Sequence, residues 1–230
     1  MTRTDLHRRI VQRRWATLAL AVSVASVSCD SQDATAPKTP ATACPIQFRE
    51  ASDRTTISFV HTDGHSGQRY IMETITAGLA LFDYDGDGLT DIYFLNGAPL
   101  KGSKVSNRPK NALYRNEGGW KFSDMTDEAG LGDTGYGLGV AVADIDNDGD
   151  PDLYVSNFGA NVLYRNEGDG TFTDITVEAG VGNGTAMGAG VSFLDIDGDG
   201  FLDLYVANYV NFTYDAHVTH DRTGFTEYAG

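Results

Sequence analysis

Three short acidic loops carry the residues of this chain that are best suited to chemistry. Each loop has the pattern D-x-D-x-D-G-x-x-D, and the three copies span residues 83–91, 144–152 and 195–203. Carboxylates crowded in this way repel one another unless a cation neutralises them, and clusters of hard oxygen ligands suit Ca²⁺. A single copy would fit a solvated acidic turn, but three copies in the same register argue against chance. The sequence therefore predicts three calcium sites, one in each loop.

The predicted ligands occupy the same positions in every loop. Aspartates supply side-chain oxygens at positions one, three, five and nine, and a backbone carbonyl completes the shell at position seven. The glycine at position six allows the positive φ that a tight reversal needs. The predicted side-chain ligands are Asp83, Asp85, Asp87, Asp91, Asp144, Asp146, Asp148, Asp152, Asp195, Asp197, Asp199 and Asp203, and the predicted carbonyl ligands are those of Leu89, Asp150 and Phe201.

The segments on both sides of these loops are predicted to be β-strands. Short apolar runs rich in β-branched and aromatic residues precede each loop, as in residues 78–82, and follow it, as in residues 92–95. An EF-hand would instead need flanking helices and a bidentate Glu at its twelfth position, where Phe94, Val155 and Val206 stand. Each loop is therefore predicted to be the turn of a β-hairpin.

A second repeat follows the first two loops. Residues 111–132 match residues 161–182 without a gap and share the pattern Asn-x-Leu-Tyr-Arg-Asn-Glu-Gly. Several short strands recurring at a period of roughly 40 to 60 residues are typical of β-propeller blades. We expect an all-β fold, a β-propeller, with blades at about 76–127, 138–177 and 188–230 and an orphan strand within 47–74.

The propeller is predicted to be incomplete in this chain. No copy of the Asn-x-Leu-Tyr-Arg-Asn motif follows Asp203, so the third blade stops early. A closed propeller has about four to eight blades, and a complete three-blade solenoid would leave long unpaired edges. We therefore expect residues 46–230 to form a partial propeller and the chain to be the N-terminal fragment of a longer protein.

The motifs resemble those of a known family. The acidic loops, together with segments of the form Asn-x-Leu-Tyr-Arg-Asn-Glu-Gly-x-Gly-x-Phe-x-Asp-x-Thr, resemble FG-GAP/VCBS repeats, the blades of integrin α-subunit propellers. Residues 57–67, Glu73, residues 78–88 and residues 208–212 resemble the ASPIC/UnbV group, which is related to cartilage acidic protein. The resemblance implies a secreted propeller that is stabilised by calcium, with the loop residues above as ligands.

The first part of the chain is predicted to direct export. Residues 1–29 contain an arginine-rich start and then a short apolar stretch of small residues, which is the pattern of a secretory signal. Residues 25–29 resemble a bacterial lipoprotein cleavage site with Cys29 as the acylated residue, although Ser26 stands where Leu is usual. Plain cleavage and an uncleaved anchor are the alternatives. Residues 30–45 are predicted to be a disordered tether, because they lack large apolar residues.

Charge limits the partners of this chain. The net charge is −15, and an acidic surface repels nucleic acid and anionic lipid. We therefore expect no nucleic-acid partner, and membrane contact only through a lipid anchor or the signal segment. The expected location is extracytoplasmic, either lipid-anchored to the cell envelope or secreted. Cys44 is left without a partner in the chain if Cys29 carries lipid.

Outside the loops, His61, His65 and Glu73 are the candidates for acid–base or metal chemistry. No third basic ligand stands at a regular spacing from them, so we expect the histidines to cap turns and Glu73 to bond backbone groups near the entry strand. The sequence contains no serine or cysteine nucleophile motif, no glycine-rich phosphate loop and no His-Glu-x-x-His. No catalytic residue is predicted.

Two further residue types recur in register. Tyr93, Tyr154 and Tyr205 stand at the same place after each acidic loop, which indicates packing between blades. Arg115 and Arg165 occupy the same place in the second repeat and are expected to pair with neighbouring carboxylates. Neither set requires a catalytic interpretation.

The function that this sequence favours is binding. We expect a non-catalytic, calcium-binding propeller module that binds a protein or a glycan through the connections between its blades. One alternative is a propeller enzyme of carbohydrate or secondary metabolism, with catalytic residues in a missing C-terminal part. Another is a purely structural module of the cell surface.

Overall fold

The computed structural model describes residues 48–75, 77–105, 107–222 and 225–228. Most of these residues belong to one compact unit, Arg49–Gly230. The predicted signal segment, Cys29 and the predicted tether lie outside the described residues. Within the described part of the chain, no helix is long and apolar enough to cross a membrane.

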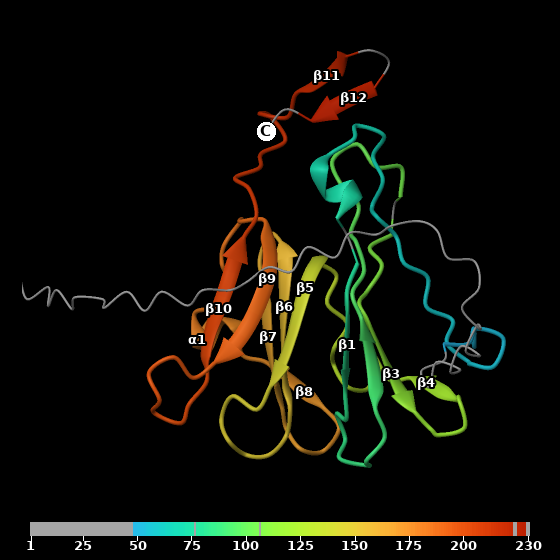
Figure 1. Ribbon diagram of the computed structural model, residues 1–230, viewed down its shortest axis with the longest axis vertical. Coiled ribbons are helices and arrows are strands. Elements are labelled where there is room, and N and C mark those ends of the chain that lie inside the picture. The colour runs from blue at the N-terminus through green and yellow to red at the C-terminus, as the bar shows by residue number, and fades with distance from the viewer. Residues whose placement is uncertain (1–47, 76, 106, 223–224, 229–230) are drawn as a thin grey trace, which may run out of the picture. The chain divides into compact units, whose positions relative to one another are not determined.

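The first sheet has four antiparallel strands in the order β1-β2-β3-β4 (Figure 1). These strands are β1 (Leu79–Phe82), β2 (Asp91–Phe94), β3 (Ala112–Asn116) and β4 (Phe122–Asp124). Phe82 pairs with Asp91, so the first acidic loop is the turn between β1 and β2. The predicted hairpin is confirmed.

The second sheet repeats the first. It has the order β5-β6-β7-β8, with β5 (Tyr136–Ala143), β6 (Asp152–Phe158), β7 (Val162–Asn166) and β8 (Phe172–Asp174). The register is also repeated, because Leu153 pairs with Tyr164 as Ile92 pairs with Tyr114. A one-turn helix, α1 (Thr176–Ala179), follows the second sheet and ends at Gly180, whose φ is 69°.

The third sheet contains only two described strands, β9 (Gly188–Leu194) and β10 (Asp203–Asn208). Its acidic loop is again the hairpin turn, because Leu194 pairs with Asp203. A separate hairpin of β11 (Thr219–Arg222) and β12 (Phe225–Tyr228) follows. The fold is therefore all-β with successive blade-like sheets, as predicted, and the described residues form no closed ring.

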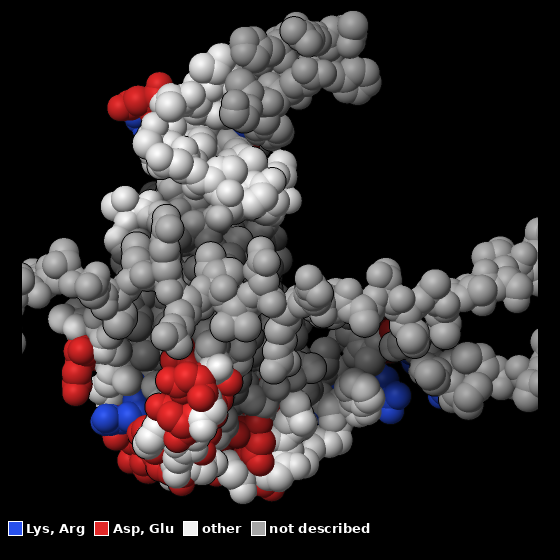
Figure 2. Space-filling model, turned by 60° about the vertical axis from the view of Figure 1, so that its left-hand side comes forward, with Lys and Arg blue, Asp and Glu red and all other residues white. Residues whose placement is uncertain are grey.

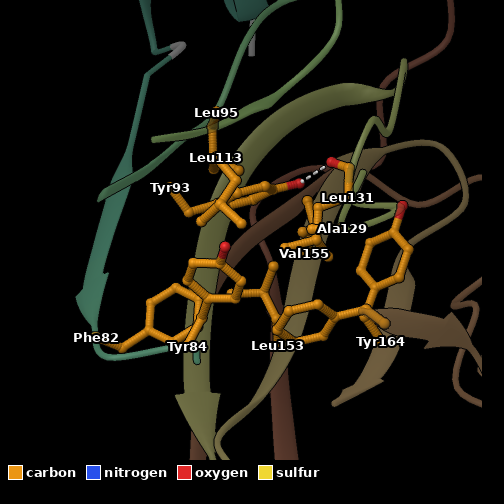
Figure 3. Close-up of a cluster of buried hydrophobic side chains, with 11 residues drawn as sticks. Phe82, Tyr84, Tyr93, Leu95, Leu113, Ala129, Leu131, Leu153, Val155 and Tyr164 are labelled. Carbon is orange, nitrogen blue, oxygen red and sulfur yellow. Dashed lines mark hydrogen bonds between the residues drawn. The ribbon is translucent and has the colours of Figure 1, made fainter. Parts of the chain in front are cut away.

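The main core lies between the first two sheets (Figure 3). Side chains alternate across a strand, so each sheet offers one face to each neighbour. The Tyr93 hydroxyl donates a hydrogen bond of 2.9 Å to the Leu131 carbonyl, which satisfies its polar tip inside this core. The buried members of the core are Phe82, Tyr84, Tyr93, Leu95, Leu113, Ala129, Leu131, Leu153, Val155, Tyr164 and Phe172.

The orphan strand expected within 47–74 does not form among the described residues of that segment. The only regular element there is a short 3₁₀ helix, η1 (Ile71–Thr74), and Phe48 is 95% exposed. The segment is held by other contacts, because the Thr56 hydroxyl bonds the backbone of Phe122 and the Phe59 ring stacks on Phe94 at 4.7 Å. A strand needs a ladder partner, and these residues contact the first sheet through side chains instead.

Candidate metal centres

The three acidic loops lie at the same end of their sheets. Figure 1 shows the β1–β2, β5–β6 and β9–β10 turns at the lower end of the strands, and Figure 2 shows acidic side chains gathered at that end. This placement follows from the repeat, because each loop is the first hairpin turn of its sheet.

Three carboxylates converge in each loop. In every group, one oxygen from each residue lies within 4.8 Å of the others. Separations of this size suit carboxylates that share one cation. The groups are Asp83, Asp85 and Asp91; Asp144, Asp146 and Asp152; and Asp195, Asp197 and Asp199.

The backbone of each loop wraps around its first aspartate. Asp83 Oδ2 accepts a hydrogen bond of 2.8 Å from the amide of Gly88, and Asp195 Oδ2 accepts one of 3.0 Å from Gly200. Gly88 and Gly200 have φ values of 83° and 90°, which only glycine adopts without strain. The position-six glycine predicted from the sequence therefore has a clear structural role.

The ninth aspartate is the buried member of the first two loops. Asp152 is 0% exposed, and its carboxylate accepts hydrogen bonds of 2.8 Å from both the Ile145 and the Asn166 amides. Asp91 is also 0% exposed and accepts from Tyr84 at 3.0 Å and from Asn116 at 2.7 Å. One carboxylate thus joins the loop to the third strand of its own sheet.

Burial makes the charge of these two aspartates costly without a cation. Burial is the main reason that the pKa of Asp152 is raised to about 6. The nearby Asp146 and Asp148 also act to raise this pKa, and its two backbone donors act in the opposite direction. Burial likewise raises the pKa of Asp91 above its usual range, with a smaller contribution from Asp85. A divalent cation would offset both the desolvation and the repulsion.

The donor set fits calcium in its chemistry. Each group offers carboxylate oxygens and no sulfur or imidazole ligand, which suits a hard cation. Ca²⁺ takes about six to eight oxygens, so ligands beyond the three carboxylates are needed. The carbonyls of Leu89, Asp150 and Phe201 remain predictions for that role.

The arrangement of loops and sheets matches a known repeat. A family model for an FG-GAP-like repeat matches residues 83–155 and again residues 147–206, which together make up more than half of the chain. This chain belongs to the FG-GAP-like repeat family. The matches begin with the first acidic loop and end within β10, so they contain all three candidate centres of these repeats.

Other comparisons add little to this assignment. A search of curated proteins gives no significant match. Among solved structures, the FG-GAP-like chain is similar to a lectin from Agrocybe aegerita that recognises non-reducing terminal N-acetylglucosamine, with 23% identity and a TM-score of 0.31. The similarity covers 56% of this chain and 32% of the lectin chain. This chain therefore spans about a third of the lectin's length.

The position-five aspartate does not join the groups of the first two FG-GAP-like loops. Asp87 lies 3.3 Å from Arg115, whose Nε also lies 2.7 Å from Asp85. The same arginine of the second repeat, Arg165, pairs instead with Glu167 at 2.8 Å. Both arginines therefore pair with carboxylates, as predicted, but only Arg115 reaches into a candidate centre.

Glu73 and His65 lie together outside the repeats. The side chain of Glu73 is 6% exposed, and its carboxylate accepts hydrogen bonds from the amide of Ser66, at 3.1 Å, and from the Ser66 hydroxyl. His65 Nδ1 lies 3.5 Å from the same carboxylate. The bond from the Ser66 amide agrees with the expectation that Glu73 bonds backbone groups, and turn capping by the histidines stays a prediction.

The tyrosines that recur in the FG-GAP-like repeats serve packing in the first two sheets. Tyr93 and Tyr154 are 0% exposed, and the Tyr154 hydroxyl donates to the Val181 carbonyl at 2.8 Å. Tyr154 also meets Phe193 of β9 in an edge contact, with ring centroids 6.4 Å apart. Tyr205 differs, because it is 62% exposed.

The sequence analysis predicted no structural role for the asparagines that recur in the repeats. The side-chain amide of Asn166 donates to the Tyr84 carbonyl at 2.9 Å, so it joins the first acidic loop to the second sheet. Asn161 Oδ1 accepts from the Asn157 amide at 2.8 Å, and an equivalent bond joins Asn111 to Asn96 at 2.7 Å. The signal was present, since these asparagines recur at fixed positions of the repeat.

Proposed function

We propose that this chain is an extracytoplasmic, calcium-stabilised β-propeller module of the ASPIC/UnbV type whose role is to bind a protein or a glycan. The observation that carries the calcium part of the proposal is the convergence of three carboxylates in each acidic loop. The FG-GAP-like repeats support a binding module rather than an enzyme.

Calcium would act on the structure of the loops. When bound, it supplies positive charge to carboxylates that otherwise repel one another, and it binds only where the fold brings them together. The residues that would hold it are the three groups named above, and Asp87, Asp148 and Asp203 stay predicted as further ligands.

The proposed binding surface is distinct from these loops. It consists of residues 97–110, which lie in the β2–β3 connection, and of the segment after Asn208. The β2–β3 connection is much longer than its counterpart between β6 and β7, residues 159–161. The two parts of this surface contact each other, because Lys101 lies 3.3 Å from Asp215 and its ammonium group lies 5.8 Å from the centre of the Tyr214 ring. A surface of this kind combines aromatic and charged groups, which suits either class of partner.

A calcium titration of Asp146→Ala tests the assignment of the loops. We expect the wild-type chain to bind three ions and the variant to lose the second site, with affinity there falling on the order of tenfold or more, because affinity depends on the number of charged ligands. Isothermal titration of the metal-free chain measures the stoichiometry. Asp215→Ala is the matched control, because its side chain is 95% exposed and lies outside the loops. Three sites of unchanged affinity in Asp146→Ala would contradict the proposal.

The proposed location rests on Cys29. We expect Cys29→Ser to release the protein from the membrane into the soluble extracytoplasmic fraction, or to leave its precursor unprocessed. The reason is that the variant lacks the cysteine that would carry the acyl chains of a mature bacterial lipoprotein, and stable membrane attachment needs more than one such chain. Fractionation of expressing cells with immunoblotting measures this. Equal membrane partitioning and unchanged processing would instead favour an uncleaved signal segment as the anchor.

A further inference from the structure

The β2–β3 connection is basic in an otherwise acidic chain. The net charge of the chain is −15, yet residues 97–110 contain four basic residues and no acidic one. The corresponding connection of the second sheet, residues 159–161, carries no charge. The long connection therefore adds positive charge that the repeat itself does not need. Its basic residues are Lys101, Lys104, Arg108 and Lys110.

This connection lies at the opposite end of the first sheet from the acidic loop. β2 begins at Asp91, beside that loop, and ends at Phe94, shortly before the basic residues. A strand rises about 3.3 Å per residue, so the two ends of β2 are about 10 Å apart. The Debye length is about 8 Å at physiological ionic strength, so solvent ions screen the basic residues from the acidic loop.

The start of the connection is fixed against residues 62–70. The Leu100 amide donates to the Gly64 carbonyl at 3.2 Å, and the Leu100 side chain is 5% exposed in a small core. A side chain at Gly102 would touch Gln68. Backbone bonding and a buried anchor therefore hold the basic residues beside this segment.

Four cations on these two segments are accessible to an anion. Arg69, from the neighbouring segment, and Lys104 and Arg108, from the connection, are exposed and form no ion pair among the described residues. Lys101 lies 3.3 Å from Asp215, but the side chains are 63% and 95% exposed, and an ion pair at such a surface is weak. We call Arg69, Lys101, Lys104 and Arg108 the basic platform.

The apolar side chains of these segments point inward. Tyr70, Ala98 and Leu100 are at most 6% exposed, and Val105 is the large apolar side chain that the described part of the connection exposes, at 39%. Protein interfaces depend on aromatic or apolar anchors at their centre, and proteins that bind single-stranded nucleic acid stack bases on exposed aromatic rings. Lysine and arginine instead suit sulfate and carboxylate groups. The platform therefore fits a polyanion with little apolar surface.

We propose that the basic platform binds an acidic glycan through the sulfate or carboxylate groups of the sugar chain. This partner class rests on the proposed function, in which the chain is a binding module, and narrows its partner. Lys101 exchanges Asp215 for an anionic group of the glycan, and Arg69 and Arg108 each offer a planar set of donors that matches two oxygens of one group. Binding weakens as the ionic strength rises, because exposed charges are screened by salt.

A titration with defined polyanions tests the partner class. A heparin oligosaccharide supplies sulfate groups, an oligogalacturonate supplies carboxylates, and dextran is the neutral control; each is titrated into the intact chain in the presence of calcium. We expect saturable binding of at least one acidic glycan and none of dextran. Absence of binding by both acidic glycans would overturn the proposal. Equally tight binding of polyglutamate or of single-stranded DNA would retain a binding module but overturn the choice of a glycan.

A pair of matched double variants tests the site. Lys104→Gln with Arg108→Gln should weaken binding of the acidic glycan by about tenfold or more, because two hydrogen bonds to charged groups are lost. Arg54→Gln with Lys121→Gln removes the same charge at the other end of the first sheet, where Lys121 lies in the β3–β4 turn and Arg54 lies over the exposed Trp120 ring of that turn. We expect this control to bind as tightly as the wild-type chain. Equal affinity of the two folded double variants would contradict the proposed site. Circular dichroism checks the fold, and the calcium titration tests the metal part of the proposed function independently of these results.

Discussion

Replacing Asp152 by alanine is expected to lower the free energy of unfolding by about 3 kcal/mol in saturating calcium, because it strands buried donors and removes a charged ligand. The carboxylate is fully buried and accepts from Ile145 in its loop and from Asn166 in β7. Alanine leaves both amides without their acceptor. Calcium must be present, since burial already makes the uncompensated carboxylate costly.

Asp203→Ala is the matched control for this prediction. It stands at the same loop position, but it is exposed and no described third strand donates to it. This substitution also removes a predicted calcium ligand, but it leaves only the Ile196 amide without its acceptor, so we expect a cost smaller by about 1 kcal/mol or more than that of Asp152→Ala. Urea denaturation followed by circular dichroism measures both variants, with the midpoint interpreted at constant m. Equal costs for the two substitutions would show that burial and strand contact do not set the importance of the ninth aspartate.

The elements that repeat were the most predictable part of the fold. Each acidic loop lies between two short apolar runs, and the local pattern alone requires a hairpin turn there. The Asn-x-Leu-Tyr-Arg-Asn segments form β3 and β7 as expected, since their apolar residues face a neighbouring strand and a neighbouring sheet. Repetition supplied independent copies of the same signal.

The segment before the first sheet was predicted wrongly because its pattern is local and its contacts are not. An orphan strand was expected within residues 47–74, but a strand forms only beside a partner. The described part of this segment contacts the first sheet through side chains such as Thr56 and Phe59, and it meets the β2–β3 connection through single backbone hydrogen bonds of Thr62 and Gly64. The sequence carries no information on that choice.

The side-chain partners of the two repeated arginines also could not be predicted from the sequence. Arg115 and Arg165 share the motif Arg-Asn-Glu, yet one contacts Asp85 and the other contacts Glu167. Rotamers of long side chains decide between such partners, and their energies differ little at an exposed surface. The same position of the repeat therefore has different side-chain contacts in the first and second sheets, although the sequence analysis treated the copies as equivalent.

Removing calcium is expected to have the largest effect on the whole chain. A ligand that binds only the native state stabilises it by about 2.7 kcal/mol for each site at a hundredfold excess over Kd. Three such sites correspond to a fall in melting temperature on the order of 10 °C or more when the ions are removed. Magnesium should restore stability less well than calcium, because it demands a tighter octahedral shell and retains its water.

The melting temperature of the intact chain, recorded with calcium and then with EDTA at constant ionic strength, tests the central claim most directly. EDTA already saturated with calcium is the control for effects of the chelator itself. The account predicts a large fall with EDTA, full recovery with excess calcium and smaller recovery with magnesium. A melting temperature that is the same with calcium and with EDTA would contradict the claim that the three acidic loops are calcium sites.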